Sequence, residues 1–365
     1  MRKAVVAALM LVVAFMACRR EDPTPEPAIA PVGNEARSVV FDLDLVPYPT
    51  LSEYQFFDGA LANLVPTARV LPFEPITPLF SDYAHKKRFV WMPEGVHATY
   101  NSDGTVLDFP DGAVLIKNFF YDHVQPDETR RIIETRLMYR KQGQWHFADY
   151  IWNAEQTEAY FSLAGAYTNL IWRDDHEEMR CVTYRIPSEV ECHTCHKVDD
   201  LNSPIGPKPQ NLNSTIMYAD GPMNQLAKWE EVGYLASGWP TNINTVVKWD
   251  DPTQPLQDRV RAYVDMNCAH CHSEGRHCDY RPMRFAWSES ADPVNLGVCV
   301  EPEDIIEPSQ THIVAAGNAA RSMLYYRLSS ADEAVRMPLF GRTLVHQEAV
   351  DLVRTWINSL GPPCP

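Results

Sequence analysis

The pattern Cys-x-x-Cys-His occurs twice, as CHTCH at residues 192–196 and as CAHCH at residues 268–272. Two intervening residues set the cysteines about one helical turn apart, and the next histidine can turn its imidazole under whatever the sulfurs hold. This pattern is the attachment signature of c-type haem, in which both thiols form thioethers with the haem vinyl groups and the histidine ligates the iron. The sequence therefore predicts two covalently bound haem c groups and a chain that folds around them.

Other interpretations explain less of the pattern. A zinc site built from two Cys-x-x-Cys elements usually has about 15 to 20 residues between them, whereas 72 residues separate Cys195 from Cys268. A thioredoxin-like pair needs a βαβ setting, which neither motif has, and simple disulfides leave both histidines unexplained. The expected haem-binding residues are Cys192, Cys195, His196, Cys268, Cys271 and His272.

The second axial ligand decides the chemistry of each iron, because a His/Met iron favours electron transfer whereas an open site admits small ligands or peroxide. For the second haem we expect Met337, because a helix before CAHCH, a Met-Pro loop and an apolar C-terminal helix are together similar to a class I cytochrome c. For the first haem the candidates are Met217 and Met223, and a side chain that arrives through folding, such as His176 or Met179, stays open.

The first 18 residues are typical of an export signal: Arg2 and Lys3 precede an apolar run that ends at Met16, and Ala17 precedes Cys18. The run is shorter than the roughly 20 residues that span a bilayer. We expect a signal peptide over 1–17, a lipid on Cys18 and a charged, Pro-rich tether over 18–38. The alternatives are an ordinary secretory peptide or a short uncleaved anchor. The expected location is the envelope of a Gram-negative bacterium, as a periplasm-facing or outer-membrane lipoprotein.

Charge and the remaining cysteines narrow the partners and the compartment. A formal net charge of −16 excludes nucleic acid bound through its phosphates and favours redox protein partners that are neutral or basic. Outside the motifs and the leader, an even number of cysteines suits disulfides in an exported protein. The nearest pair in sequence is Cys278 with Cys299, which leaves Cys181 with Cys364, although four cysteines allow three connectivities.

The periodicity of apolar residues changes near residue 187. Before it, short alternating runs predict strands, with hairpins over 104–121 and 131–153 and a last strand over 179–186. After it, helical stripes occupy 221–235, 255–268 and 346–361. We therefore expect an α+β protein of two domains, an antiparallel β-sandwich-like domain followed by a mainly α dihaem cytochrome c region. The expected segments are a β-rich domain at 39–186, a first haem segment at 187–250 and a class I cytochrome c-like domain at 251–365.

Several longer stretches, including PLFSDYAHKKRFVWMPEG, WHFADYIWNAEQTEA, IGPKPQNLN and NCAHCH, resemble a family of exported bacterial dihaem c-type cytochromes with lipoprotein leaders. The resemblance implies single-electron transfer between a donor and an acceptor protein in the cell envelope. The alternative is a haem enzyme, a dihaem peroxidase or oxidase with an open first haem. Within the first stretch, the residues at 81–87 are expected to form a solvated loop.

Overall fold

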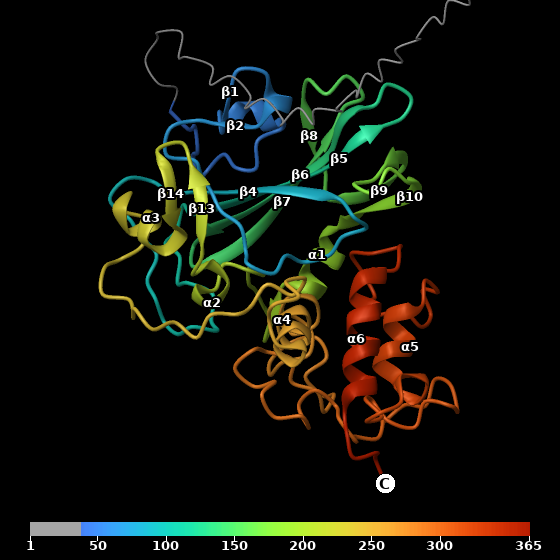
Figure 1. Ribbon diagram of the computed structural model, residues 1–365. Coiled ribbons are helices and arrows are strands. Elements are labelled where there is room, and N and C mark those ends of the chain that lie inside the picture. Colours follow the sequence, from blue (N-terminus) through green and yellow to red (C-terminus); the bar gives the residue numbers. More distant parts are fainter. Residues whose placement is uncertain (1–37) are drawn as a thin grey trace, which may run out of the picture. The chain divides into compact units, whose positions relative to one another are not determined.

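The computed structural model describes residues 38–365, all of which lie in one unit (Figure 1). The expected signal peptide over 1–17, the lipidated Cys18 and the tether up to residue 37 lie outside the described residues. Within 38–365, no helix combines the length and the apolar character needed to cross a bilayer.

The largest sheet of the described residues is antiparallel and has eight strands. From β3 to β8 each strand pairs with the next along the chain, and the β9–β10 hairpin joins the end of β5 through Val124 and Trp172. Its strands are β3 (Leu71–Pro72), β4 (His85–Trp91), β5 (Val114–Val124), β6 (Thr129–Lys141), β7 (Gln144–Trp152), β8 (Ala159–Phe161), β9 (Ala164–Arg173) and β10 (Met179–Ser188). Three small hairpins are β1 (Phe57–Asp58) with β2 (Val65–Pro66), β11 (Lys197–Val198) with β12 (Leu201–Asn202), and β13 (Thr215–Tyr218) with β14 (Gly221–Asn224).

The helices are short and nearly all follow the sheet in sequence. The α-helices are α1 (Glu189–Cys195), α2 (Pro209–Leu212), α3 (Gln225–Glu231), α4 (Leu256–Asn267), α5 (Met323–Ser329) and α6 (Gln347–Ser359). The 3-10 helices are η1 (Leu51–Tyr54), η2 (Leu61–Asn63) and η3 (Ala319–Arg321).

The β6–β7 hairpin confirms the expected hairpin over 131–153. Its two-residue turn needs a left-handed backbone at both positions, and Gln142 and Gly143 have φ angles of 54° and 73°. β10 likewise confirms the strand over 179–186. The hairpin expected over 104–121 is wrong, because β5 pairs with β4 and β6 instead, and residues 104–109 contribute only an isolated bridge from Asp108 to Thr99.

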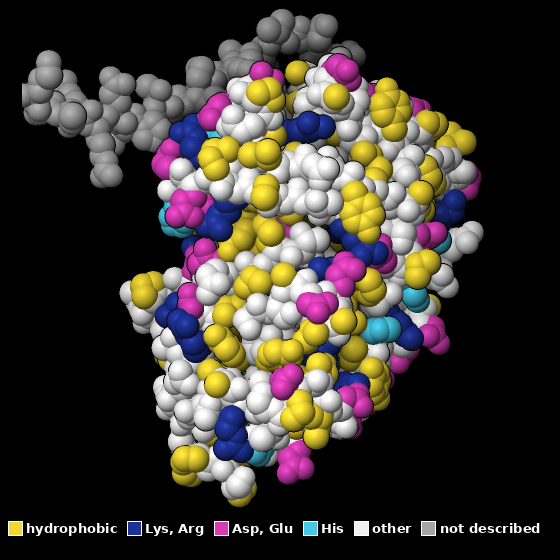
Figure 2. All heavy atoms as spheres, turned by 90° about the vertical axis from the view of Figure 1, so that its right-hand side faces the viewer, with side chains coloured by type: hydrophobic (Ala, Val, Ile, Leu, Met, Phe, Trp, Pro, Cys, Tyr) yellow, Lys and Arg dark blue, Asp and Glu magenta, His cyan; other side chains and the backbone are white. Residues whose placement is uncertain are grey.

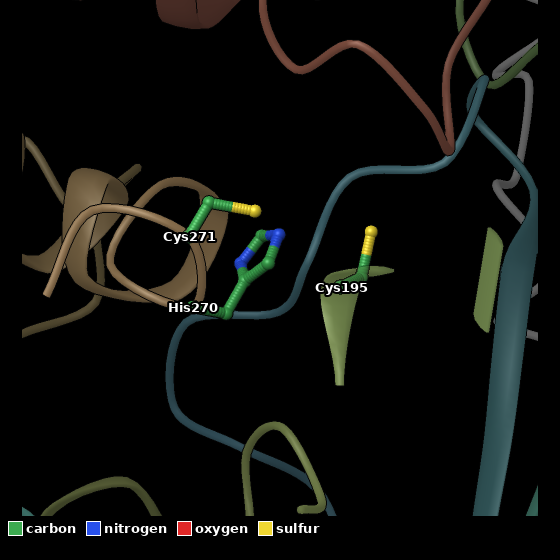
Figure 3. Close-up of side chains that lie close together, drawn as sticks. All are labelled: Cys195, His270 and Cys271. Carbon is green, nitrogen blue, oxygen red and sulfur yellow. The ribbon is translucent and has the colours of Figure 1, made fainter. Parts of the chain in front are cut away.

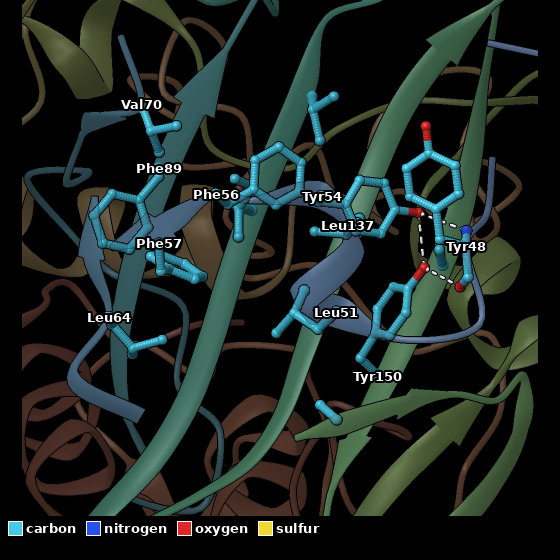
Figure 4. Packing of buried hydrophobic residues seen from close by; sticks show 14 of the residues in the cluster. Tyr48, Leu51, Tyr54, Phe56, Phe57, Leu64, Val70, Phe89, Leu137 and Tyr150 are labelled. Carbon is cyan, nitrogen blue, oxygen red and sulfur yellow. Dashed lines mark hydrogen bonds between the residues drawn. The ribbon is translucent and has the colours of Figure 1, made fainter. Parts of the chain in front are cut away.

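One face of the sheet packs against the chain that precedes β1. Leu51 and Tyr54 of η1, together with Phe56, pack over β5 to β7 (Figure 4). The Tyr54 and Tyr150 hydroxyls are 2.7 Å apart, and the Tyr150 hydroxyl donates to the Tyr48 carbonyl at 2.8 Å. These bonds satisfy polar atoms that would otherwise be buried without partners, which costs about 1–3 kcal/mol per group.

The opposite face packs against α3 and the loop between β4 and β5. Val90, Leu115 and Met138 line this face, and Leu226 and Trp229 of α3 belong to the same cluster. A single sheet is thus covered on both sides, so the expected β-sandwich-like arrangement is wrong. The alternation of residues predicts that both faces of a strand are covered, but it does not tell whether a second sheet or loops and a helix provide the cover.

The expected mainly α dihaem region is also wrong. Among the described residues 27% are in strands and 18% in helices, and the chain after Ser188 adds two of the small hairpins and a long irregular stretch over 268–318. Two of the expected helices are confirmed as α4 and α6, whereas α3 covers only part of 221–235. Helical stripes occur only at those few places, and proline, glycine and aspartate interrupt the sequence between them. The division near residue 187 stays a prediction.

α4 and α6 pack together and form a third core. Val260 and Val264 of α4 meet Val353 and Trp356 of α6, and the indole N–H of Trp356 donates to Gln257 at 2.5 Å. This core fixes the end of α4, from which the second Cys-x-x-Cys-His motif begins.

A disulfide joins Cys299 to Cys364, with 65 residues of sequence separation. Disulfide formation is therefore confirmed, but the pairing of Cys278 with Cys299 and of Cys181 with Cys364 is wrong, since Cys181 and Cys278 are free. The chain returns after α6 to the segment at 314–316: the Ala316 amide contacts the Cys364 sulfur at 3.2 Å, and the Cys299 amide donates to the Val314 carbonyl at 2.9 Å. The closeness of Cys278 and Cys299 in the sequence does not predict that the chain returns to this segment after α6.

We predict that Cys364→Ser lowers the free energy of unfolding by about 4 kcal/mol, because a crosslink over a loop of this length restricts the unfolded chain. Urea unfolding followed by tryptophan fluorescence measures the change. Cys181→Ser, which removes an exposed free thiol, is the matched control and should leave stability within about 0.5 kcal/mol of the parent chain. Equal stability of the two variants would contradict the prediction.

Candidate functional site

Each motif forms one helical turn with the same backbone hydrogen bond. The His196 amide donates to the Cys192 carbonyl at 2.9 Å, and the His272 amide donates to the Cys268 carbonyl at 2.9 Å. The first turn ends α1, which starts at a capping box of Ser188 and Glu191. The second follows α4 directly. The spacing of the motif thus places both cysteines and the histidine of each turn on one short stretch of backbone.

The first motif lines a cavity of about 160 Å³, called here the first cavity. Cys192, Cys195 and His196 lie on its wall, and its floor is the face of the sheet that carries Leu115 and Met138. Further walls come from the loop at 204–207, the end of α4 and the loop at 338–342.

His196 is held in the orientation of a metal ligand. Its Nδ1 is 2.9 Å from the Ser203 carbonyl, and because a carbonyl only accepts, Nδ1 carries the proton and Nε2 is left with a free lone pair. Burial lowers the pKa of His196 to about 3, so the ring is neutral, as ligation requires. Its edge also packs on Phe147, with ring centroids 5.4 Å apart.

The second motif lines a larger cavity of about 410 Å³, called here the second cavity. Cys268, Cys271 and His272 lie on its wall together with Met337, the expected second axial ligand. Burial lowers the pKa of His272 to about 4. The remaining lining is largely apolar, with Ile313, Met323, Leu328 and Phe285.

The backbone of Met337 is anchored on both sides. Its amide donates to the Arg327 carbonyl at 3.0 Å, and the Arg342 guanidinium donates to its carbonyl at 3.0 Å. Asp82 holds the same loop, because its Oδ1 accepts the amides of Thr343 and Leu344, each at 2.7 Å.

The expectation of a solvated loop over 81–87 is therefore wrong. The Asp82 residue is 2% exposed, and β4 already begins at His85. Charged residues in short sequence patterns usually face solvent, and only the tertiary contact with residues 343 and 344 reveals the role of Asp82.

The two cavities meet where the motifs touch. The ligand atoms of Cys195, His270 and Cys271 all lie within 4.8 Å of one another (Figure 3). A hydrogen bond with Cys195, followed by burial, raises the pKa of the Cys271 thiol. Cys195, His270 and Phe340 line both cavities. Short-range patterns do not predict this contact, since the two turns are 72 residues apart.

Two sets of hydrogen bonds hold the motifs together. The Asp199 amide, in the hairpin after the first motif, donates to the Gly275 carbonyl at 2.6 Å, and Arg276 donates to the Lys197 carbonyl at 3.0 Å. Asp265 of α4 accepts from Gln210 at 3.3 Å. Its other donors are Lys208, Asn211 and the Trp287 amide.

The structure brings neither Met217 nor Met223 to the first cavity. Met217 is 72% exposed on the β13–β14 hairpin, and Met223 lies in β14 opposite Ile216. The first cavity is instead lined by Met266 and His270, neither of which was expected as a ligand. In the sequence they lie on either side of Cys268, at the end of the helix that leads into the second motif. The end of such a helix can face the first motif.

The donor set fits haem better than a single metal ion. Each motif presents two thiols and one neutral histidine to its cavity, and Met337 adds a thioether at the second. Cys195, His270 and Cys271 also have the composition of a zinc ligand set, but that use takes one thiol from each motif and leaves both His196 and His272 without a role. No protein-family model, curated protein or solved structure matches this chain, so the assignment rests on its own residues.

We predict that, in chain produced without haem, a short thiol-specific crosslinker joins Cys195 to Cys271, because their sulfurs lie within 4.8 Å. Peptide mass spectrometry after digestion identifies the linked pair. Cys195→Ser should abolish the product, whereas Cys192→Ser should retain it. Linkage of Cys195 only to Cys192 would show that the two motifs do not meet.

Proposed function

We propose that this chain is a dihaem c-type cytochrome that transfers single electrons between redox protein partners in the bacterial cell envelope. Cys192 and Cys195 would attach the first haem with His196 on its iron. Cys268, Cys271 and His272 would hold the second, with Met337 as its other axial ligand. When bound, the haem irons supply the one-electron chemistry by changing between the ferrous and ferric states.

The chain's own residues orient these groups and set their surroundings. The Ser203 carbonyl accepts a hydrogen bond from Nδ1 of His196. This bond orients the ring and leaves Nε2 free to bind a metal. Arg327 and Arg342 hold the Met337 backbone at the wall of the second cavity. Much of the lining there is apolar, and a methionine ligand in apolar surroundings would favour the reduced state of the iron.

The observation that carries the proposal is the contact between Cys195 and Cys271. If Cys195 and Cys271 each held a haem, the two groups would be attached at sulfurs that lie within 4.8 Å of one another. Electron exchange weakens steeply with distance through protein, so neighbouring attachment points suit a relay between two centres. A pair of independent sites would gain nothing from Asp265 and the Asp199–Gly275 bond that join the motifs.

The enzyme alternative needs an open position on the first iron. The first cavity contains Met266 and His270, both of which are iron-ligand types, and Met266 is buried. We therefore favour electron transfer over peroxidase or oxidase chemistry.

The partners are proposed to be soluble or membrane-bound redox proteins with neutral or basic docking surfaces, because the chain carries a net charge of −16. Figure 2 shows acidic and basic side chains interspersed on one face. The net charge would thus act mainly as a long-range field that raises the rate of encounter.

The haem content tests the proposal directly. In a host that matures c-type cytochromes, intact-mass analysis should find two haems per chain, and the double variant Cys192→Ser/Cys195→Ser should retain one. The double variant at Cys268 and Cys271 should also retain one. Cys278→Ser is the control and should keep two. A haem-free chain that carries one zinc ion would overturn the proposal.

We predict that Met337→Ala lowers the midpoint potential of the second haem, because a methionine ligand favours the ferrous state. The expected change is at least tenfold in the reduction equilibrium, or about 59 mV for one electron. Potentiometric titration of the visible spectrum measures both haems. Met323→Ala is matched to it, since Met323 also lines the second cavity, and it should leave the potential close to that of the parent. Unchanged potentials in Met337→Ala would remove Met337 as a ligand.

A further inference from the structure

Four charged side chains form a row across the floor of the first cavity. Arg88 of β4 is in register with Lys117 of β5, Lys117 with Arg136 of β6, and Arg136 with Asp149 of β7. Residues in register on neighbouring strands share a face and lie about 5 Å apart. All four line the first cavity, so this charged row is part of the site and not of the outer surface.

The charged row is unusual because the neighbouring row of residues on the same face of the sheet is apolar. Two residues along each strand, Val90, Leu115, Met138 and Phe147 continue the same face, as strand alternation requires. These side chains pack against the α3 side of the molecule. The floor of the first cavity thus has an apolar row, in which Phe147 packs on His196, and a charged row next to it.

Only one cation of the row has a carboxylate partner. Arg136 forms an ion pair with Glu134, donating from Nε at 2.8 Å, and the Tyr184 hydroxyl donates to the same carboxylate at 2.6 Å. Among the described residues, neither Arg88 nor Lys117 has an acidic oxygen within ion-pair distance, and the ammonium of Lys117 lies over the Phe119 ring, 4.7 Å from its centroid.

Asp149 does not supply the missing negative charge. Asp149 is 2% exposed, and neither carboxyl oxygen has a hydrogen-bond partner among the described residues. Burial, followed by the nearby Glu134 carboxylate, raises its pKa well above the usual range, which favours the neutral carboxyl. Glu74 acts on Arg88 only at longer range. Burial and the flanking Arg88 and Arg136 charges lower the pKa of Lys117, which is the response of a cation that lacks an anion.

We propose that Arg88 and Lys117, beside the paired Arg136, form the carboxylate site that receives the two propionates of the first haem. A haem carries its propionates on the half of the ring opposite the vinyl groups. The first cavity has cysteines on one wall and two unpaired cations on its floor, which matches two thioethers and two carboxylates. This inference rests on the proposed function and deepens it, because it assigns how the chain orients and neutralises the first haem.

The same cations would also attract a free oxyanion, and the two sources are separable. Propionates are covalently part of the haem, so they occupy the site at a fixed stoichiometry that added salt does not change. A free anion would instead bind with a saturable concentration dependence.

The test uses holoprotein with two haems per chain, verified by mass. Lys117→Met and, separately, Arg88→Gln should each lower the midpoint potential of the first haem, because a nearby positive charge stabilises the reduced form, which holds one more electron. The expected change is about tenfold in the reduction equilibrium, or about 59 mV, with the second haem unchanged. The propionate bending band of the resonance Raman spectrum should shift in the same variants.

Lys87→Met is the matched control. Because side chains alternate along β4, Lys87 projects to the face of the strand opposite to that of Arg88. It should leave both potentials and the Raman band as in the parent chain. Two attached haems with unchanged first-haem potential in both Lys117→Met and Arg88→Gln would overturn the inference and leave the dihaem proposal standing. A parent potential that titrates with sulfate, at constant ionic strength, would overturn it in favour of a free anion. Loss of haem from the parent chain would instead refute the proposed function.

Discussion

The relative position of the two motifs depends on Asp265. Its carboxylate is buried at the end of α4 and accepts hydrogen bonds from Gln210 and Asn211, which follow the first motif, and from the Trp287 amide, which follows the second. A buried carboxylate is costly unless several donors surround it, so this carboxylate requires both segments to be in place. The two Cys-x-x-Cys-His turns therefore belong to one site, although each has its own cavity.

The sheet and the segments after it are likewise parts of one structure. Asp82, just before β4, accepts two amides from the loop that carries Met337. The charged row on β4 to β7 forms the floor of the first cavity. The β-rich part thus supplies one wall of the first site and holds a loop of the second. A β-rich module serving only to dock a partner would have no need of these buried contacts.

Patterns within a few residues predicted local structure well. The turn at Gln142 and Gly143, the helices α4 and α6 and the geometry of both motifs follow from short-range chemistry that a sequence displays. What covers the sheet, which cysteine joins Cys299 and which residues face the first cavity depend on contacts between distant segments. Met217 and Met223 were expected as ligands of the first haem because they follow the first motif in the sequence. Met217 instead lies exposed on the β13–β14 hairpin, and Met266 lines the first cavity. The sequence of β5 alone does not single out Lys117, because the role proposed for Lys117 depends on Arg88 and Arg136 on the neighbouring strands.

The contact between Cys195 and Cys271 also bears on how the protein is made. It closes a loop of more than 70 residues, and such closure is entropically costly and is completed after local turns have formed. Each motif is a helical turn closed by its own backbone hydrogen bond, so it can form without this contact. If haem were attached at both motifs, as proposed, an enzyme would reach Cys192, which is buried in the closed site, more readily before the two motifs come together.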